Sequence, residues 1–202
     1  LALRGAIVAT VMAAAAMGTQ VLAGYQIVNA LWSFSVNILD SVAIAGQALV
    51  GAKIGARCFG EARNLTRITA RAGAFMGVLV GAAFVALGFI AAPAFSPNPN
   101  IQAVVAGGML ISGITMPMQG WMWALDGILI GAGDFRYLAI TLFAAAAAYV
   151  SALVVVITFA IPLIEGEFMQ AVALWSTFDI ILMGGRALAN GLRIKSDVWM
   201  KG

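Results

Sequence analysis

The sequence predicts an all-α integral membrane protein, with six transmembrane helices in one lobe spanning residues 1–202. Of these residues, 63% are hydrophobic and 9% are charged, with a mean hydropathy of +1.02, whereas a soluble domain carries about 25% charged residues. Six apolar segments occur, each near the roughly 20 residues that span a bilayer as a helix. All Lys and Arg residues fall on one side of a six-helix topology, as the positive-inside rule requires.

The breaks between the apolar segments are chemically distinct. They are a lone Gly24, a basic connection at 53–71, a proline-rich turn at 93–100, a glycine-rich turn at 131–136 and an acidic loop at 162–167. Because each proline disfavours helix in the residue before it, the turn at 93–100 cannot be helical throughout. The first segment could instead be a signal peptide, but its length favours a transmembrane helix with further sequence before it. The expected helices cover 6–23, 25–50, 72–92, 101–130, 138–161 and 168–188.

The charged residues predict the orientation of this segment. We expect a multi-pass protein of the cell (plasma or inner) membrane with both termini of the segment cytoplasmic. The outside loops then carry only Glu165 and Glu167. The basic connection could also bind anionic lipid or nucleic acid, but a topogenic role already explains its charges, and we expect no nucleic-acid partner. The inside residues are Arg4, Lys53, Arg57, Arg63, Arg67, Arg71, Arg136, Arg186, Arg193, Lys195 and Lys201.

The residue content argues against an enzyme. The sequence has no His and a single cysteine, Cys58, so histidine-based metal sites, histidine general bases and an intrachain disulfide are excluded. We expect no catalytic residue, no metal centre and no cofactor, apart from H⁺ or Na⁺ as a coupling ion. Glycines 73, 77 and 81 recur at a spacing that allows close helix packing.

Polar side chains lie on one face of the second, fourth and sixth predicted helices, within arcs of about 60–80° at 100° per residue. Lipid cannot satisfy such a face, which must therefore contact protein or water. Asp126 and Asp40 are the candidates for transport or ion coupling, because a charge at membrane depth costs roughly 3 kcal/mol. For the Ser, Thr and Asn positions, interhelical hydrogen bonding is the alternative. The candidate cavity-lining residues are Gln26, Asn29, Ser33, Asn37, Gln47, Ser112, Thr115, Gln119 and Asp179.

Two features near these acids leave alternatives open. Asp179 precedes Arg186 by seven residues on the same face, so a structural ion pair between them is an alternative to a transport role. Pro117 lies nine residues before Asp126 and predicts a bend. Bendable helices beside an intramembrane charge occur in alternating-access carriers, and a kinked helix in a rigid bundle is the alternative.

Two segments carry a family resemblance. LDSVAIAGQALVGAKIGA (39–56) and ALDGILIGAGDFRYL (124–138) resemble the multidrug and toxic compound extrusion (MATE) family, closest to its DinF-like branch, and the likeness covers nearly the whole chain. The resemblance implies two six-helix lobes in a V-shaped arrangement, with this chain as the C-terminal lobe and the N-terminal lobe absent from it. Asp126 matches an acidic residue on the family's tenth helix that some branches use in cation coupling. Residues 6–23 lack the acid that those branches carry on the seventh helix.

The resemblance implies a cation-coupled (H⁺ or Na⁺) multidrug efflux antiporter that works by alternating access on amphipathic, often cationic, small molecules. Its partners would be the lipid bilayer and the missing N-terminal lobe. One alternative is a flippase for lipid or lipid-linked substrates on a related fold, which would act independently of ion gradients. Another is a structural membrane subunit without transport activity.

Overall fold

The computed structural model describes residues 2–196 and 198–200, and these residues form helices joined by short turns, without a β-strand. The predicted all-α class is thereby confirmed. Five helical spans in this part of the chain are long and apolar enough to cross a membrane, at 19–55, 59–90, 99–131, 135–163 and 167–195. A shorter apolar helix, α1 (Ala2–Met17), precedes these five spans in the chain.

The spans are built from the following elements. The second, third and fourth segments are α2 (Thr19–Gly55), α3 (Phe59–Ile90) and α5 (Pro99–Gly131), with the single turn α4 (Ala92–Phe95) before α5. The fifth is α6 (Phe135–Val155), which continues through η1 (Val156–Ala160) and η2 (Ile161–Leu163). The sixth is α7 (Glu167–Ser176), a π-helical stretch η3 (Thr177–Met183) and α8 (Gly184–Lys195), followed by η4 (Val198–Met200).

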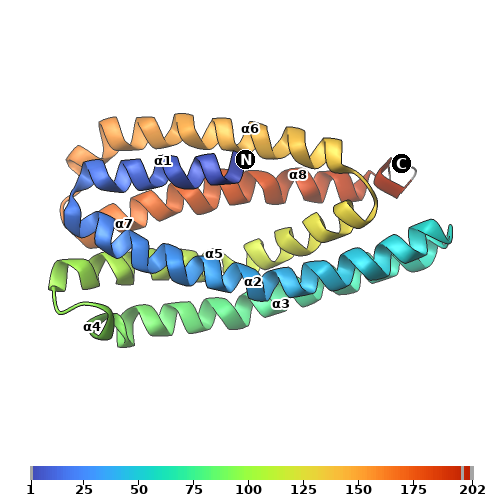
Figure 1. The fold of residues 1–202 in the computed structure, drawn as a ribbon, viewed down its shortest axis with the longest axis horizontal. Helices are drawn as coiled ribbons and strands as arrows, with labels where there is room; N and C mark the ends of the chain where they lie inside the picture. The colour runs from blue at the N-terminus through green and yellow to red at the C-terminus, as the bar shows by residue number, and fades with distance from the viewer. Residues whose placement is uncertain (1, 197, 201–202) are drawn as a thin grey trace.

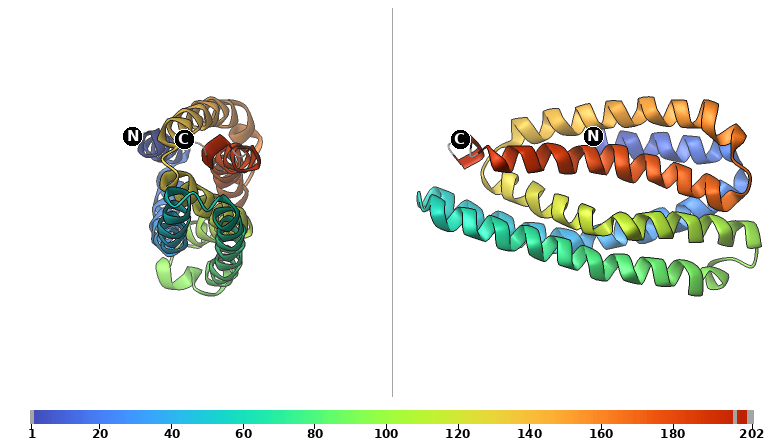
Figure 2. Two further views of the ribbon diagram at one scale, coloured as in Figure 1. Left: turned by 90° about the vertical axis from the view of Figure 1, so that its right-hand side faces the viewer. Right: turned by 180° about the vertical axis from the view of Figure 1, so that it is seen from behind.

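The helices pack in two groups that meet at α5. Helices α2, α3 and α5 form one group, and α1, α6 and the continuous α7–η3–α8 helix form the other (Figures 1 and 2). Helix α5 packs on α2 and α3 and also on α7, η3 and α8. Fully buried side chains such as Met109, Met116 and Met122 therefore line α5 along most of its length.

The first two helices differ from the prediction at their junction. Helix α1 ends at Met17, and the break lies at Gly18, whose φ of 133° suits glycine. The predicted break at Gly24 is wrong, because that residue lies inside α2. A side chain there would collide with Val104 of α5, so Gly24 serves helix packing rather than a turn.

Most of the predicted basic connection is helical. Only residues 56–58 separate α2 from α3, so Arg63, Arg67 and Arg71 belong to the first turns of α3 rather than to a loop. Residues 61–71 contain neither Gly nor Pro, and the buried Ala62 and Thr66 show that one face packs against the protein. Hydropathy placed the helix start at 72, whereas the helix continues beyond the apolar run.

Glycines bring α3 and α5 into close contact, as the spacing predicted. A side chain at Gly77 would collide with the backbone of Met116 and Pro117, and one at Gly73 with the backbone of Gly120. Helix α5 runs unbroken through Pro117. The glycine face of α3 therefore packs directly on the segment of α5 that precedes Asp126.

The connections cluster at two ends of the molecule. The α2–α3 turn, the α5–α6 turn and the C-terminal end of α8 lie at one end, and the α3–α5 and α6–α7 connections lie at the other (Figure 1). The first end carries Lys53, Arg136 and Lys195, and the second carries Glu165. Arg186, which was also predicted to lie inside, is buried, with 7% exposure. The predicted inside residue Lys201 lies outside the described residues.

Candidate functional site

Asp126 lies on the face of α5 that meets α8. Arg186 donates a hydrogen bond from Nη2 to Asp126 Oδ2, which makes a buried ion pair. Asn190, one turn farther along α8, donates from Nδ2 to Asp126 Oδ1 at 2.7 Å. Asp126 and Arg186 are each 7% exposed, so each charge compensates the other in a region where an unpaired ion is costly.

The guanidinium of Arg186 has two further contacts. Its Cζ lies 4.8 Å from the centre of the Trp123 ring, a cation–π distance. Its Nη1 approaches the Sδ of Met183 at 3.7 Å. Trp123 precedes Asp126 by one helical turn on α5. The pair is therefore fixed from both helices, and Arg186 has little freedom to leave Asp126 while that carboxylate is charged.

A cavity of about 240 Å³ adjoins this pair, between α2, α5, α6 and α8. Its charged side chains are Asp40 from α2 together with Asp126 and Arg186, so two carboxylates face one guanidinium. Asp40 is half-buried. The rest of the wall is mainly apolar and includes Ala43, Ile44, Gly127, Ile130, Leu138 and Leu142.

A second polar cluster surrounds Asp179 in η3. Its side chain has no exposed surface. Ser112 Oγ donates to Asp179 Oδ2 at 3.1 Å, and Gln119 Nε2 donates to Oδ1 at 3.0 Å. Gln119 Oε1 accepts a hydrogen bond from Trp32 Nε1 of α2 at 2.9 Å. The cluster thus links α2, α5 and η3 in the middle of the bundle.

Asp179 does not pair with Arg186, which was the alternative expected from their shared face. Seven positions along a helix correspond to roughly 10 Å along its axis, so each side chain finds a nearer partner on α5. Ser112, Gln119 and Asp126 lie at seven-residue intervals on α5 and meet Asp179 and Arg186 of the last helix. The polar faces of these two helices therefore meet each other.

The polar face of α2 lies differently. Gln26, Ser33 and Asn37 are exposed, and Asn29 is half-buried. Gln47, also exposed, lines the cavity beside Asp40.

On α5, the half-buried Thr115 donates to backbone carbonyls of its own helix and accepts from Gln119. The structure thus places Asp40, Gln47 and Asp126 at one cavity and Ser112, Gln119 and Asp179 in a separate buried cluster.

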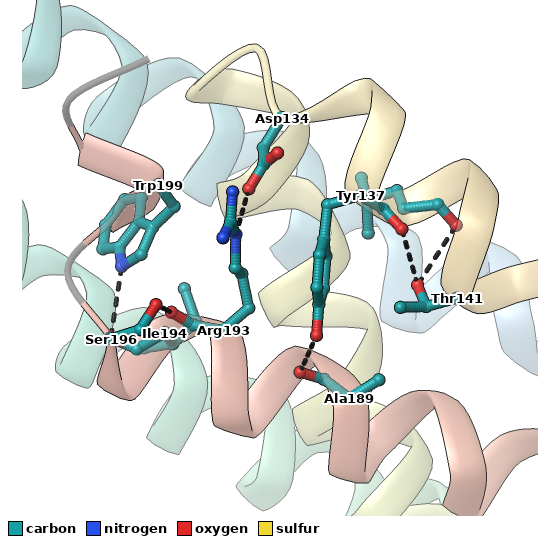
Figure 3. Close-up of polar contacts among 9 residues, drawn as sticks. Asp134, Tyr137, Thr141, Ala189, Arg193, Ile194, Ser196 and Trp199 are labelled. Atoms are coloured by element: carbon teal, nitrogen blue, oxygen red, sulfur yellow. Dashed lines mark hydrogen bonds and ion pairs between the residues drawn. The ribbon is translucent and has the colours of Figure 1, made fainter.

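A third set of contacts holds the α5–α6 turn to α8 (Figure 3). Arg193 Nε donates to Asp134 Oδ2 at 2.6 Å, and its Cζ lies 4.7 Å from the centre of the Tyr137 ring. Tyr137 donates from its hydroxyl to the carbonyl of Ala189 at 2.7 Å. Thr141, which lines the cavity, donates to the carbonyl of Tyr137 at 2.9 Å. These bonds fix the end of the cavity nearest the basic side of the molecule.

Sequence reasoning missed part of this site. Trp123 and Asn190 were not among the candidates, although both contact the Asp126–Arg186 pair. Asn190 does lie on the polar face of the last helix, one turn after Arg186, and that position was the available signal. Trp123 gave none, because an aromatic residue in an apolar helix is usually a packing residue.

No cluster of three or more His, Cys, Asp or Glu that could hold a metal occurs among the described residues.

The chain is similar to two curated plant proteins. It is 29% identical over 141 residues to Protein DETOXIFICATION 43 of Arabidopsis thaliana, covering 70% of this chain and 27% of that protein. It is also 29% identical over 136 residues to Protein DETOXIFICATION 45, chloroplastic, of the same plant, covering 65% of this chain and 23% of that protein. The chain thus matches about a quarter of the length of these relatives. No solved structure matches it significantly.

The family comparison covers more of the chain. The family model described as MatE matches residues 5–157, from α1 into η1, and so includes Asp40, Asp126 and most of the cavity wall. This match extends over more than half of the sequence and agrees with the helical membrane fold. The chain therefore belongs to the MatE family of membrane transporters.

Proposed function

We propose that this chain is the C-terminal lobe of a cation-coupled antiporter of the DinF-like branch, which exports amphipathic, cationic small molecules from the cell in exchange for H⁺ or Na⁺. The observation that carries the proposal is the cavity beside Asp126. It places two carboxylates and one guanidinium in an otherwise mostly apolar wall at membrane depth.

The charges of the cavity support a cationic substrate. With Arg186 engaged by Asp126, the carboxylate of Asp40 remains as an excess negative charge. Asp40 has no ion-pair partner in the described part of the chain. An apolar wall with a few well-placed polar groups is the usual composition of a small-molecule site. An amphipathic cation would bury its apolar part against Ile44 and Leu142 and place its charge near Asp40.

Coupling would act through the Asp126–Arg186 pair. A proton or Na⁺ at Asp126 would neutralise the carboxylate and weaken its hold on Arg186. The contact between α5 and α8 would then favour a different arrangement, and the binding of the ion and of the substrate would bias the same two states. An ion shifts this equilibrium only as far as it binds the two states differently, and the loss of a buried ion pair provides such a difference.

The other half of the pathway would come from a second six-helix lobe of the same protein. The exposed polar side chains of α2, Gln26, Ser33 and Asn37, support this arrangement. A polar face on a membrane helix needs protein or water beside it, and a water-filled pathway between two lobes would supply both.

Drug susceptibility of cells tests the proposal. The full-length protein would be expressed with Asp126→Asn or Asp40→Asn, and Glu165→Gln, in the exposed loop of the opposite end, would be the matched control. We expect both cavity variants to lose resistance to amphipathic cations at normal membrane abundance, while Glu165→Gln keeps it. Unchanged resistance in both cavity variants would remove these carboxylates from the mechanism.

The same strains separate the alternatives. A lipid flippase predicts translocation of a labelled lipid that is independent of Na⁺ and H⁺ gradients. A structural subunit predicts no flux of any tested substrate. Either result with wild-type protein would overturn the antiporter proposal.

A further inference from the structure

Asp179 is the buried acid that the proposed coupling step leaves unused. Its side chain is completely buried, whereas Asp126 retains 7% exposure. Ser112 and Gln119, which donate hydrogen bonds to its two carboxylate oxygens, are both neutral. Asp126, in contrast, is matched by the full charge of Arg186. A buried carboxylate without a cation is costly in its charged form, so the two acids face opposite electrostatic situations.

The charged and titratable groups around Asp179 do not change this contrast. Helix α6 contributes Tyr149, whose hydroxyl shares a hydrogen bond of 2.5 Å with Thr10 of α1. Helix α5 contributes Asp126, and α8 contributes Arg186, but these two are bonded to each other. Helix α7 carries Glu167 in its first turn, at the far end of the element. None of these groups brings a positive charge to Asp179.

The orientation of Gln119 indicates which cation the site suits. The indole nitrogen of Trp32 can only donate, and it donates to Gln119 Oε1. The amide group is therefore fixed with Nε2, a donor, toward Asp179. A metal ion at Asp179 Oδ1 would face this N–H group instead of an oxygen ligand, while the hydroxyl of Ser112 lies at the other carboxylate oxygen, Oδ2. A proton needs no such ligand shell, so the geometry favours a proton over Na⁺.

The backbone at Asp179 is also unusual. Asp179 lies in the π-helical stretch Thr177–Met183, and the backbone N–H of Gly184 donates to the carbonyl of Asp179, five residues earlier. Single π-helical turns inside α-helices are frequent at functional sites. This segment joins α7 to α8, so a change in its hydrogen bonding would alter how α8 presents Arg186 to Asp126.

We propose that Asp179 is a proton-binding site, distinct from the Asp126–Arg186 pair, that is occluded in this conformation and deprotonates in another. The carboxylate would take a proton from hydronium, so that the carboxyl O–H bond forms as an O–H bond of hydronium breaks and a water molecule is released. Ser112 would then rotate its hydroxyl to accept from the new O–H group and donate to a backbone carbonyl of its own helix. The inference deepens the proposed function and rests on it, because this proton would be a second coupling ion, in addition to the H⁺ or Na⁺ at Asp126.

Infrared difference spectroscopy between high and low pH tests the site directly, on the full-length protein in lipid and without any substrate. We expect a carbonyl band of a protonated carboxylic acid to appear as the pH falls. This band should be lost in Asp179→Asn and retained in Asp126→Asn. Ser112→Ala keeps the carboxyl group and should shift the band by removing one hydrogen bond, so the assignment holds even if Asp179→Asn does not fold.

Three results would overturn the inference. They are a wild-type protein without a titrating band, a band that survives unchanged in a folded Asp179→Asn, and a band that Na⁺ abolishes at constant pH. Because the spectra need no transport, they separate this inference from the proposed function. Loss of the band in Asp179→Asn together with an absence of any ion-driven flux would support the proton site and reject the antiporter.

Discussion

Asp126 on α5 and Arg186 on α8, 60 positions apart in the chain, form a buried ion pair that Asn190 completes. The pair ties α5 to the continuous α7–η3–α8 helix, and the same two helices also meet where Ser112 and Gln119 of α5 donate hydrogen bonds to Asp179 of η3. Both charged side chains line the cavity. A ligand or ion that neutralises one of these charges therefore weakens the ion pair, and with it the contact between α5 and α8.

The ion pair predicts non-additive stability effects. Asp126→Asn leaves the guanidinium of Arg186 buried without a counter-charge, and Arg186→Gln leaves the carboxylate unpaired. Each single change should lower the free energy of unfolding by about 3–5 kcal/mol, whereas the double variant Asp126→Asn/Arg186→Gln should lose much less. Unfolding of the purified protein in mixed micelles measures all three. Additive losses in the double variant would show that the two charges do not depend on each other.

The glycine contact between α3 and α5 predicts a position-specific effect of one methyl group. At Gly77 an added Cβ would collide with the backbone of Met116 and Pro117, whereas at Gly60 nothing lies within 4 Å. We expect Gly77→Ala to lower the free energy of unfolding by about 1–3 kcal/mol. Gly60→Ala, in the same helix, should be neutral or stabilising by up to about 1 kcal/mol. Equal effects of the two changes on thermal unfolding would contradict the packing described here.

The single cysteine allows a test of orientation. Cys58 lies in the short turn between α2 and α3, next to the basic residues, and we predict that this turn is cytoplasmic. In a full-length protein without other cysteines, a membrane-impermeant maleimide should label Cys58 only after permeabilisation of the cells. Glu165→Cys in a Cys58→Ser background should be labelled in intact cells. The reverse pattern would place the basic end outside.

The fold was largely predictable because hydropathy and charge act over long, continuous segments. The helix ends were less predictable, since they depend on local features that hydropathy does not detect. Gly18 and Gly24 illustrate this point: both are lone glycines in apolar sequence, and only the positive φ of Gly18 and the packing of Gly24 against Val104 distinguish them. Likewise, α3 begins at Phe59 because one face of its basic first turns packs against the protein. Hydropathy alone predicts that this basic segment is a solvent-exposed connection.

The candidate site was predictable only within each helix. Periodicity placed Asp126 and Arg186 on polar faces, but which faces meet is decided by the packing of helices far apart in the sequence. The sequence therefore left a pair between Asp179 and Arg186 open, although the structure gives each a partner on α5. Trp32 was also missing from the predicted polar residues, because a tryptophan in an apolar helix is usually a packing residue. Its indole N–H group nevertheless orients Gln119 by a hydrogen bond.

Ion-driven flux in proteoliposomes tests the central claim most directly. The full-length protein would be reconstituted with a fluorescent amphipathic cation and an imposed gradient of either H⁺ or Na⁺. The charge-balanced Asp126→Asn/Arg186→Gln variant would be compared, because it should fold while lacking the coupling carboxylate. We predict that one of the two gradients drives uptake by the wild-type protein and that the double variant shows only background flux. Wild-type flux that ignores both gradients, or a double variant as active as the wild type, would contradict the account.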